Sequence, residues 1–358
     1  MGSSSEPSLL GLGGRSNRDF SLKEAWGKNQ FNNCFPASLA FYMHRENLEP
    51  VYLTLGEDFE VRHGKVSVAE VFGMNPSSEN LFFGFESQFT PYHPMVVGRL
   101  PRADLVTMDI SGGGGRCLRD VEIKLTALPD SSTVERPDSG QSSEIVVRPD
   151  TIVYAALSMA KLFEGRRKEL SELLGSERYE GVDWRSSEDV RPLVPDLAND
   201  LDRVLGSEVG RQSPLMMQPV WKTVGKTLAL HEQCFDIFVW SDFALTRLFL
   251  DRAKSQAREQ MTREMRSVVW IVKMLHDFAS TGKMNPGKTT NEIVYAPRND
   301  KAFAISGSRT LRYLESPELA RPRIKRSAVK EIVLGGGEKH LSPERRLDAV
   351  VQSTFDLL

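Results

Sequence analysis

The sequence has little cysteine, and the cysteines it has are widely spaced. Three occur among 358 residues: Cys34, Cys117 and Cys234. An odd number without a CxxC pair argues against both a zinc knuckle and a disulfide framework. Thiols left unpaired in this way are typical of a reducing compartment, so we expect a cytoplasmic protein.

Long apolar runs are also absent. No stretch approaches the roughly 20 consecutive apolar residues that a membrane-spanning helix needs. The opening, residues 1–19, begins rich in Ser and Gly and has neither the basic start nor the apolar core of a signal peptide. We therefore expect a flexible N-terminal tail and no contact with a membrane.

The sequence has no excess of either charge. Lys and Arg number 46 against 48 Asp and Glu, which gives a formal net charge of -2. This balance excludes a uniformly basic coat for nucleic acid but leaves room for a locally basic cleft. The six histidines include no HxxxH pair, so we expect no zinc site.

Apolar periodicity and turn residues predict secondary structure in both halves of the chain. The predicted elements are a helix at 37–43, a strand at 51–55, helices at 151–174, 193–210 and 244–279, and short strands at 292–295 and 302–305. No internal repeat occurs. The second half is therefore expected to be largely helical.

The clearest local pattern lies between residues 104 and 126. Apolar β-forming runs at 105–108 and 121–126 flank a glycine cluster at 112–115. Two such runs around glycines predict a β-hairpin.

The second strand of this hairpin carries a carboxylate and an ammonium on one face. The strand period of two places Glu122 and Lys124 together, while Val121 and Ile123 face the other way. Two carboxylates can hold Mg²⁺, with Mn²⁺ as a substitute, and a neighbouring lysine can act on the attacking water. This arrangement predicts a metal-dependent nuclease that still requires a first acid.

Hairpin symmetry selects that acid. Placing Asp104 opposite Glu122 centres the turn on Gly113, inside the glycine run, whereas Asp109 would centre it between Gly115 and Arg116. Opposed residues come within about 5.5 Å at their Cβ atoms, close enough to share a metal. We therefore predict Asp104, Glu122 and Lys124 as catalytic residues, the two acids as metal ligands, and Asp109 in reserve because a bulge could shift the register.

The sequence contains further acids and two motif-like strings that are alternative candidates for a functional site. Glu70 and Glu86 precede the hairpin, and Glu86 is kept as a second reserve ligand because aromatic residues surround it. Arg148-Pro149-Asp150 contains a literal PD, but a helix rather than a strand is expected after it. The string from Gly282 to Thr289 fits a nucleotide phosphate loop, yet a helix is expected before it and a strand after it, which inverts the required order.

Basic side chains gather in the last third of the chain. They are interspersed with Ser308 and Tyr313, and such residues give DNA a salt-dependent affinity. The residues we predict to contact DNA are Lys288, Arg309, Arg312, Arg323, Lys325 and Arg326.

Two parts of the sequence resemble known nucleases. Asp104-Leu105-Val106 followed by Glu122-Ile123-Lys124 resembles the PD-(D/E)XK core, with Ala103 where the motif has proline. The strings at 122–130 and 33–37 resemble the HindVP-type restriction endonucleases, and the likeness extends over most of the chain after about residue 20.

The resemblance implies an α/β fold with a restriction-endonuclease-like core, in which helices flank a mixed central sheet. We then expect one domain over 20–358, with the nuclease core centred on 80–175 and helical, DNA-contacting elements over 176–358. The implied activity is that of a type II restriction endonuclease cutting double-stranded DNA at a short palindrome of the GRCGYC kind. A symmetric site implies a homodimer, and a restriction system implies a cognate DNA methyltransferase.

Two other functions remain open at this stage. A repair or recombination nuclease could use the same core without sequence specificity. A DNA-binding protein without catalysis could carry Glu122 and Lys124 as a simple pair across a sheet face.

Overall fold

The computed structural model describes residues 36–124, 144–207, 212–217, 221–224, 227–230, 237–255, 260–295 and 302–306, together with residues 324, 325, 327, 328 and 332. The expected N-terminal tail, 1–19, lies outside these ranges. The single-domain organisation stays a prediction.

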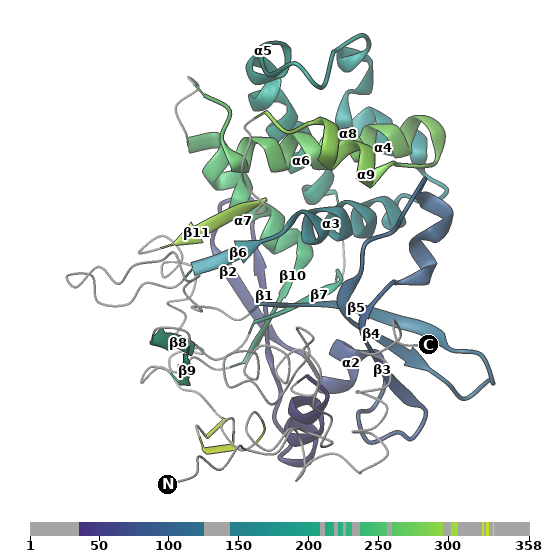
Figure 1. The fold of residues 1–358 in the computed structure, drawn as a ribbon, viewed down its shortest axis with the longest axis vertical. Coiled ribbons are helices and arrows are strands. Elements are labelled where there is room, and N and C mark those ends of the chain that lie inside the picture. The colour runs from purple at the N-terminus through teal and green to yellow at the C-terminus, as the bar shows by residue number, and fades with distance from the viewer. Residues whose placement is uncertain are drawn as a thin grey trace, which may run out of the picture.

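A mixed seven-stranded sheet forms the centre of the described fold (Figure 1). In spatial order its strands are β2 (Val61–Lys65), β1 (Val51–Leu55), β10 (Phe238–Ser241), β7 (Pro214–Met217), β5 (Arg116–Lys124), β4 (Ala103–Asp109) and β3 (Leu81–Ser87). β5 is parallel to β7 and β1 is parallel to β10, whereas the other neighbours are antiparallel. The predicted mixed sheet, and the strand predicted at 51–55, are therefore confirmed.

Helices cover the sheet and form a further layer beyond it. Residues 36–45 are helical, and the other α-helices are α2 (Val68–Phe72), α3 (Pro149–Leu162), α4 (Arg167–Leu174), α5 (Ser187–Val190), α6 (Val194–Gly206), α7 (Asp242–Ser255), α8 (Arg263–Thr281) and α9 (Pro286–Glu292). In Figure 1, α3 lies next to the sheet, and α4, α6, α8 and α9 lie beyond it. No helix within the described ranges is long and apolar enough to cross a membrane.

Smaller elements complete the described structure. Short 3-10 helices span Thr90–Met95, Ser176–Tyr179 and Arg191–Leu193. Two-stranded sheets join β6 (Glu144–Val147) to β11 (Phe303–Ser306), and β8 (Trp221–Val224) to β9 (Thr227–Leu230). The strand predicted at 302–305 is therefore confirmed as β11.

Both faces of the sheet are packed against apolar side chains. Alternation along β4 sends Leu105 to the cluster that contains α2, and Val106 to the cluster that contains α3, and both side chains are fully buried. Burying one such side chain stabilises the fold by about 1.5–3 kcal/mol. A one-residue slip would turn these residues to the wrong faces, so packing strongly specifies the register of β4 and β5.

Two helices predicted as continuous are each broken in two. The prediction of one helix over 151–174 is wrong because Gly165, with φ of 86°, interrupts it between α3 and α4. The prediction of one helix over 244–279 is wrong because Thr262 starts a separate helix, α8, by accepting a hydrogen bond from the backbone N of Met265. The helix predicted at 193–210 is confirmed by α6.

The strand predicted at 292–295 is also wrong. Asn285 caps α9 and Pro286 occupies its first position, so the chain is helical through Glu292. Tyr295 then adopts a positive φ of 53°, and its hydroxyl donates to the Trp184 carbonyl at 2.6 Å. A local helix start and one long-range hydrogen bond thus override the β-forming residues of this segment.

Candidate active site

Asp104 and Glu122 lie across from each other on neighbouring strands. Leu105 pairs with Val121, so Asp104 falls opposite Glu122 one step further along the antiparallel ladder. The Ile123 backbone N–H donates to Asp104 Oδ2 at 2.8 Å, which holds the aspartate against β5. The structure therefore contains the register that was predicted from the glycine turn.

A bulge lies between this pair and the turn. Beyond Thr107 the register of β4 and β5 shifts by one residue. Counted from the turn, where Met108 pairs with Cys117, an unbroken ladder would place Asp104 opposite Val121, and the bulge places it opposite Glu122 instead. Gly113 has a φ of 75°, which glycine adopts without strain and which fits the predicted turn.

Lys124 is the last residue of β5. Its backbone pairs with Met217 of β7, while Glu122 pairs with Leu215 in the same parallel ladder. The strand that carries Glu122 and Lys124 is therefore held on both edges, by β4 and by β7. The Lys124 side chain lies outside the described part of the structure.

Asp109, the first reserve residue, has different surroundings. It pairs with Arg116 beside the turn, and its Oδ2 lies 3.2 Å from the Arg116 guanidinium. Hydrogen bonds from Ser111 and from this guanidinium lower the pKa of Asp109. The structure does not bring Asp109 to Glu122, because five positions of β4 separate it from Asp104.

The other reserve acid lies nearer. Phe85 and Ser87 pair with the residues on either side of Asp104, which places exposed Glu86 at the position across from Asp104 on β3. Its φ of 44° marks an irregular strand position. Glu70, in contrast, closes a capping box at the start of α2, so its position has a structural explanation.

The ligand chemistry of the pair suits a hard cation. Magnesium is commonly held by one or two carboxylates while keeping several water ligands, and Asp104 and Glu122 supply such oxygens. Within the residues described, no group of three or more His, Cys, Asp or Glu could hold a metal.

Sequence reasoning missed Thr151. As expected, the Arg148-Pro149-Asp150 string leads into a helix, α3, which begins at Pro149. The Thr151 hydroxyl, in the first turn, donates to Glu122 Oε1 at 2.7 Å. The available signal was a hydroxyl residue in the first turn of a helix further along the chain, after β6.

A buried polar cluster includes Asp120 of the same strand. Asp120 precedes Glu122 by two positions and accepts a hydrogen bond from Ser213 Oγ at 3.3 Å. Burial raises the pKa of Asp120 to about 6 and that of Asp242 to about 8. Oδ2 of Asp242 has no hydrogen-bond partner among the residues described. The folded chain therefore favours the protonated form of Asp242 near neutral pH.

The loop with the phosphate-binding string lies between α8 and α9. The helix predicted before it is present as α8. The prediction of a strand after it is wrong, because helix α9 follows. Val97 N donates to the Met284 carbonyl, and Met284 N to the Met95 carbonyl, both at 2.8 Å. The loop is therefore fixed against the segment that leads into β4.

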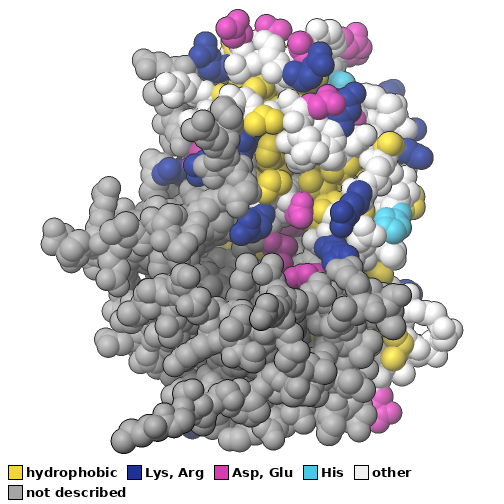
Figure 2. Space-filling view, viewed as in Figure 1, with side chains coloured by type: hydrophobic (Ala, Val, Ile, Leu, Met, Phe, Trp, Pro, Cys, Tyr) yellow, Lys and Arg dark blue, Asp and Glu magenta, His cyan; other side chains and the backbone are white. Residues whose placement is uncertain are grey.

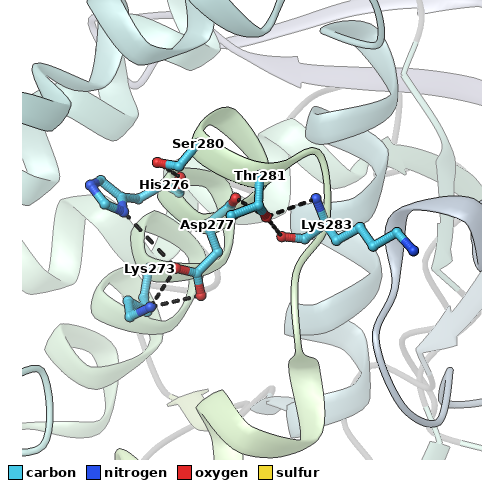
Figure 3. A network of polar contacts seen from close by, with 6 residues as sticks. All are labelled: Lys273, His276, Asp277, Ser280, Thr281 and Lys283. Carbon is cyan, nitrogen blue, oxygen red and sulfur yellow. Dashed lines mark hydrogen bonds and ion pairs between the residues drawn. The ribbon is translucent and has the colours of Figure 1, made fainter.

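Lys283 of this loop and Lys288 of α9 line a cavity of about 590 Å³. In Figure 3 the Lys273 ammonium and His276 approach the Asp277 carboxylate, whereas the Lys283 side chain extends away from them. Lys283 and Lys288 are exposed, and neither ammonium forms an ion pair with another described residue. Such cations are available to an external anion.

Of the remaining predicted DNA contacts, only Lys325 lies within the described residues. Lys325 is exposed. Arg309, Arg312, Arg323 and Arg326 lie outside the described residues.

One face of the molecule combines both charges. Figure 2 shows acidic side chains near its middle, with basic side chains on both sides of them. The structure is thus an α/β protein in which two carboxylates, Asp104 and Glu122, are opposed on adjacent strands.

Comparison with known proteins gives the family. The chain belongs to the HindVP restriction endonuclease family, which it matches over residues 26–358. It is 44% identical over 349 residues to the type II restriction enzyme HgiDI of Herpetosiphon aurantiacus, covering 98% of this chain and 96% of the relative. It is 37% identical over 353 residues to the probable type II restriction enzyme HindVP of Haemophilus influenzae, covering 98% and 95%.

No solved structure matches the chain. The family nevertheless confirms the resemblance seen in the sequence, and the chain is an enzyme of the restriction endonuclease class. The observed α/β architecture agrees with that class.

Proposed function

We propose that this enzyme hydrolyses phosphodiester bonds in double-stranded DNA with Mg²⁺ at a short palindromic site. The observation that carries the proposal is the opposition of Asp104 and Glu122 on β4 and β5, with Asp104 held by the Ile123 amide at 2.8 Å. Both relatives reported above are named as type II restriction enzymes, one of them as probable. The family resemblance suggests a GRCGYC-like recognition sequence.

Asp104, Glu122 and Lys124 have separate roles in the proposed hydrolysis. Asp104 and Glu122 would hold the metal, which when bound neutralises phosphate charge and makes water easier to deprotonate. Lys124 would bind the attacking water beside them, help to remove its proton and stabilise the developing negative charge. Mn²⁺ would substitute for Mg²⁺ because it accepts the same oxygen ligands.

Lys283 and Lys288 are proposed to contact the DNA backbone. Lys283 precedes Met284, whose carbonyl is bonded to Val97, seven residues before Asp104, and Lys288 follows in the first turn of α9. Seven extended residues span at most about 25 Å, less than one turn of DNA at about 34–36 Å. Val97 and Asp104 are therefore closer together than one turn of DNA is long, which supports a shared DNA surface. Lys325 and the arginines at 309, 312, 323 and 326 stay as further proposed contacts.

A symmetric site on two strands is most simply cut by a homodimer whose two-fold axis coincides with that of the DNA. We therefore propose a homodimer. A restriction system also requires protection of the host DNA, so we propose a cognate methyltransferase that recognises the same sequence. No direct contact between the two proteins is implied.

The test is to incubate the full chain with unmethylated plasmid DNA and Mg²⁺, and to sequence the fragment ends. Ends at one palindrome, with no cutting in EDTA and recovery in Mg²⁺ or Mn²⁺, would support the proposal. Ends at scattered sequences would indicate a nuclease without sequence specificity. Undiminished cutting in EDTA would end the metal hypothesis.

A second arm separates cutting from binding. Lys124→Ala should abolish cutting and leave DNA binding in Ca²⁺ largely intact, because the lysine acts on the water and the transition state. A wild-type chain that binds DNA without cutting any sequence would instead be a non-catalytic DNA-binding protein.

A further inference from the structure

Helix α3 presents a hydroxyl group to the candidate metal ligand Glu122. Thr151 lies in the first turn of this helix, is only 4% exposed, and donates from Oγ1 to Glu122 Oε1 at 2.7 Å. The N-cap residue, Arg148, gives the helix no side-chain cap. The positive end of the α3 dipole and a buried hydroxyl therefore act on the same carboxylate.

We propose that Thr151 is a positioning residue, which fixes the orientation of the Glu122 carboxylate for metal binding. This inference rests on the proposed function. The last side-chain torsion of glutamate is broad, so a carboxylate without a fixed partner samples many orientations. A hydrogen bond to one oxygen restricts that rotation, and partners of this kind orient metal ligands in proteins generally.

The position of Thr151 is itself fixed by its own helix. Its neighbours Ile152 and Val153 are buried in the main apolar cluster. One turn further, the Tyr154 hydroxyl accepts from Phe89 N at 3.1 Å and donates to the Pro101 carbonyl at 2.9 Å. Pro101 lies three residues before Asp104, so one helix is bonded both to Glu122 and to the segment that leads into the Asp104 strand.

The test compares variants that remove or keep the hydroxyl. Thr151→Val keeps the shape and removes the donor, and Thr151→Ser keeps the donor. Thr107→Val is the matched control, because Thr107 is also a buried threonine but lies on β4 and donates to the Phe72 carbonyl, at 2.7 Å. Thr151→Ala replaces the valine variant if that variant does not fold.

The primary measurement is Mn²⁺ binding to the full chain, with unbound Mn²⁺ followed by electron paramagnetic resonance. Loss of a group that orients a ligand weakens metal binding or activity by about 10–100-fold. We expect at least about a tenfold loss of affinity in Thr151→Val, affinity within about twofold of wild type in Thr151→Ser, and no change in Thr107→Val. The Mg²⁺ concentration for half-maximal cleavage should follow the same order.

Two results would overturn the inference alone. One is wild-type Mn²⁺ affinity in Thr151→Val while Glu122→Gln loses it, since the ligand would then need no orienting partner. The other is equal weakening in Thr151→Val and Thr107→Val, which would reflect general destabilisation. If wild-type protein binds no Mn²⁺ and cuts DNA in EDTA, the proposed metal chemistry fails and the inference fails with it.

Discussion

At the scale of single residues, Asp104 and Asp109 are two aspartates of one strand with different partners. Asp104 accepts from the backbone of the Glu122 strand, whereas Asp109 contacts Arg116 beside the turn. We expect Asp104→Asn to lower the cleavage rate by at least about a hundredfold, as for other main electrostatic groups of an active site. Asp109→Asn should have a much smaller effect. Initial rates of plasmid cleavage measure both, and an inactive Asp109→Asn beside an active Asp104→Asn would refute the assignment.

Asp242 is expected to make the free energy of unfolding depend on pH. Burial raises its pKa in the folded state to about 8, from 3.8. Because the folded pKa is the higher one, the unfolded chain releases this proton first, and stability falls as pH rises from about 4 to about 8, by at most about 1.4 kcal/mol per pH unit. Asp242→Asn cannot release a proton and should lose this part of the slope.

Urea unfolding at pH 5 and at pH 8.5 measures that difference. The variant should gain stability relative to wild type at the higher pH. Equal pH dependence in the two proteins would show that Asp242 does not control it.

At the scale of elements, the loop between α8 and α9 carries Lys283, and the first turn of α9 carries Lys288. Each phosphate contact contributes nearly one unit to the slope of log affinity against log salt concentration. The double variant Lys283→Ala, Lys288→Ala should therefore flatten that slope by up to about two units. Fluorescence anisotropy of a labelled duplex in Ca²⁺ at several salt concentrations measures it.

The matched control is Lys65→Ala. Lys65 is exposed on β2, the far edge strand of the sheet, and pairs with Glu49, an exposed ion pair that contributes little. Its slope should equal that of wild type. An unchanged slope in the double variant would place the backbone contacts elsewhere.

The hairpin of β4 and β5 was predictable because its determinants are local. Alternation fixes which residues share a face and the glycine run locates the turn, so the hairpin could be predicted, whereas the bulge that sets Asp104 opposite Glu122 could not be placed from the sequence. The contact between Thr151 and Glu122 could not be predicted from such local patterns, because it joins a helix to a strand 29 positions earlier. The insertion of β7 and β10 into the sheet depends on packing between distant segments, which no local pattern encodes.

Local signals also account for the wrong helix boundaries. Gly165 and the Thr262 cap are both visible in the sequence. Apolar periodicity continues across them, however, and periodicity alone predicts an unbroken helix. At 292–295 the β-forming residues follow a helix that begins at the Asn285 cap, and this helix extends through Glu292.

At the scale of the whole molecule, a homodimer would place one Asp104–Glu122 pair on each DNA strand. We expect wild-type enzyme to convert supercoiled plasmid to the linear form with little nicked intermediate. Mixed dimers of wild type and Glu122→Gln, purified through two different tags, should nick only one strand. Gel electrophoresis of the products distinguishes these outcomes, and linear product from mixed dimers at the wild-type rate would contradict the dimer proposal.

The bulge beyond Thr107 separates the turn from the carboxylate pair, and β7 holds β5 from the other edge. The turn can therefore change its length while Asp104 still faces Glu122. At Gly113 and Gly114 no other atom lies within 4 Å of an added Cβ, so a short inserted peptide would meet open space there. A fluorophore carried on that insertion would allow single enzyme molecules to be followed along DNA without altering Asp104 or Glu122.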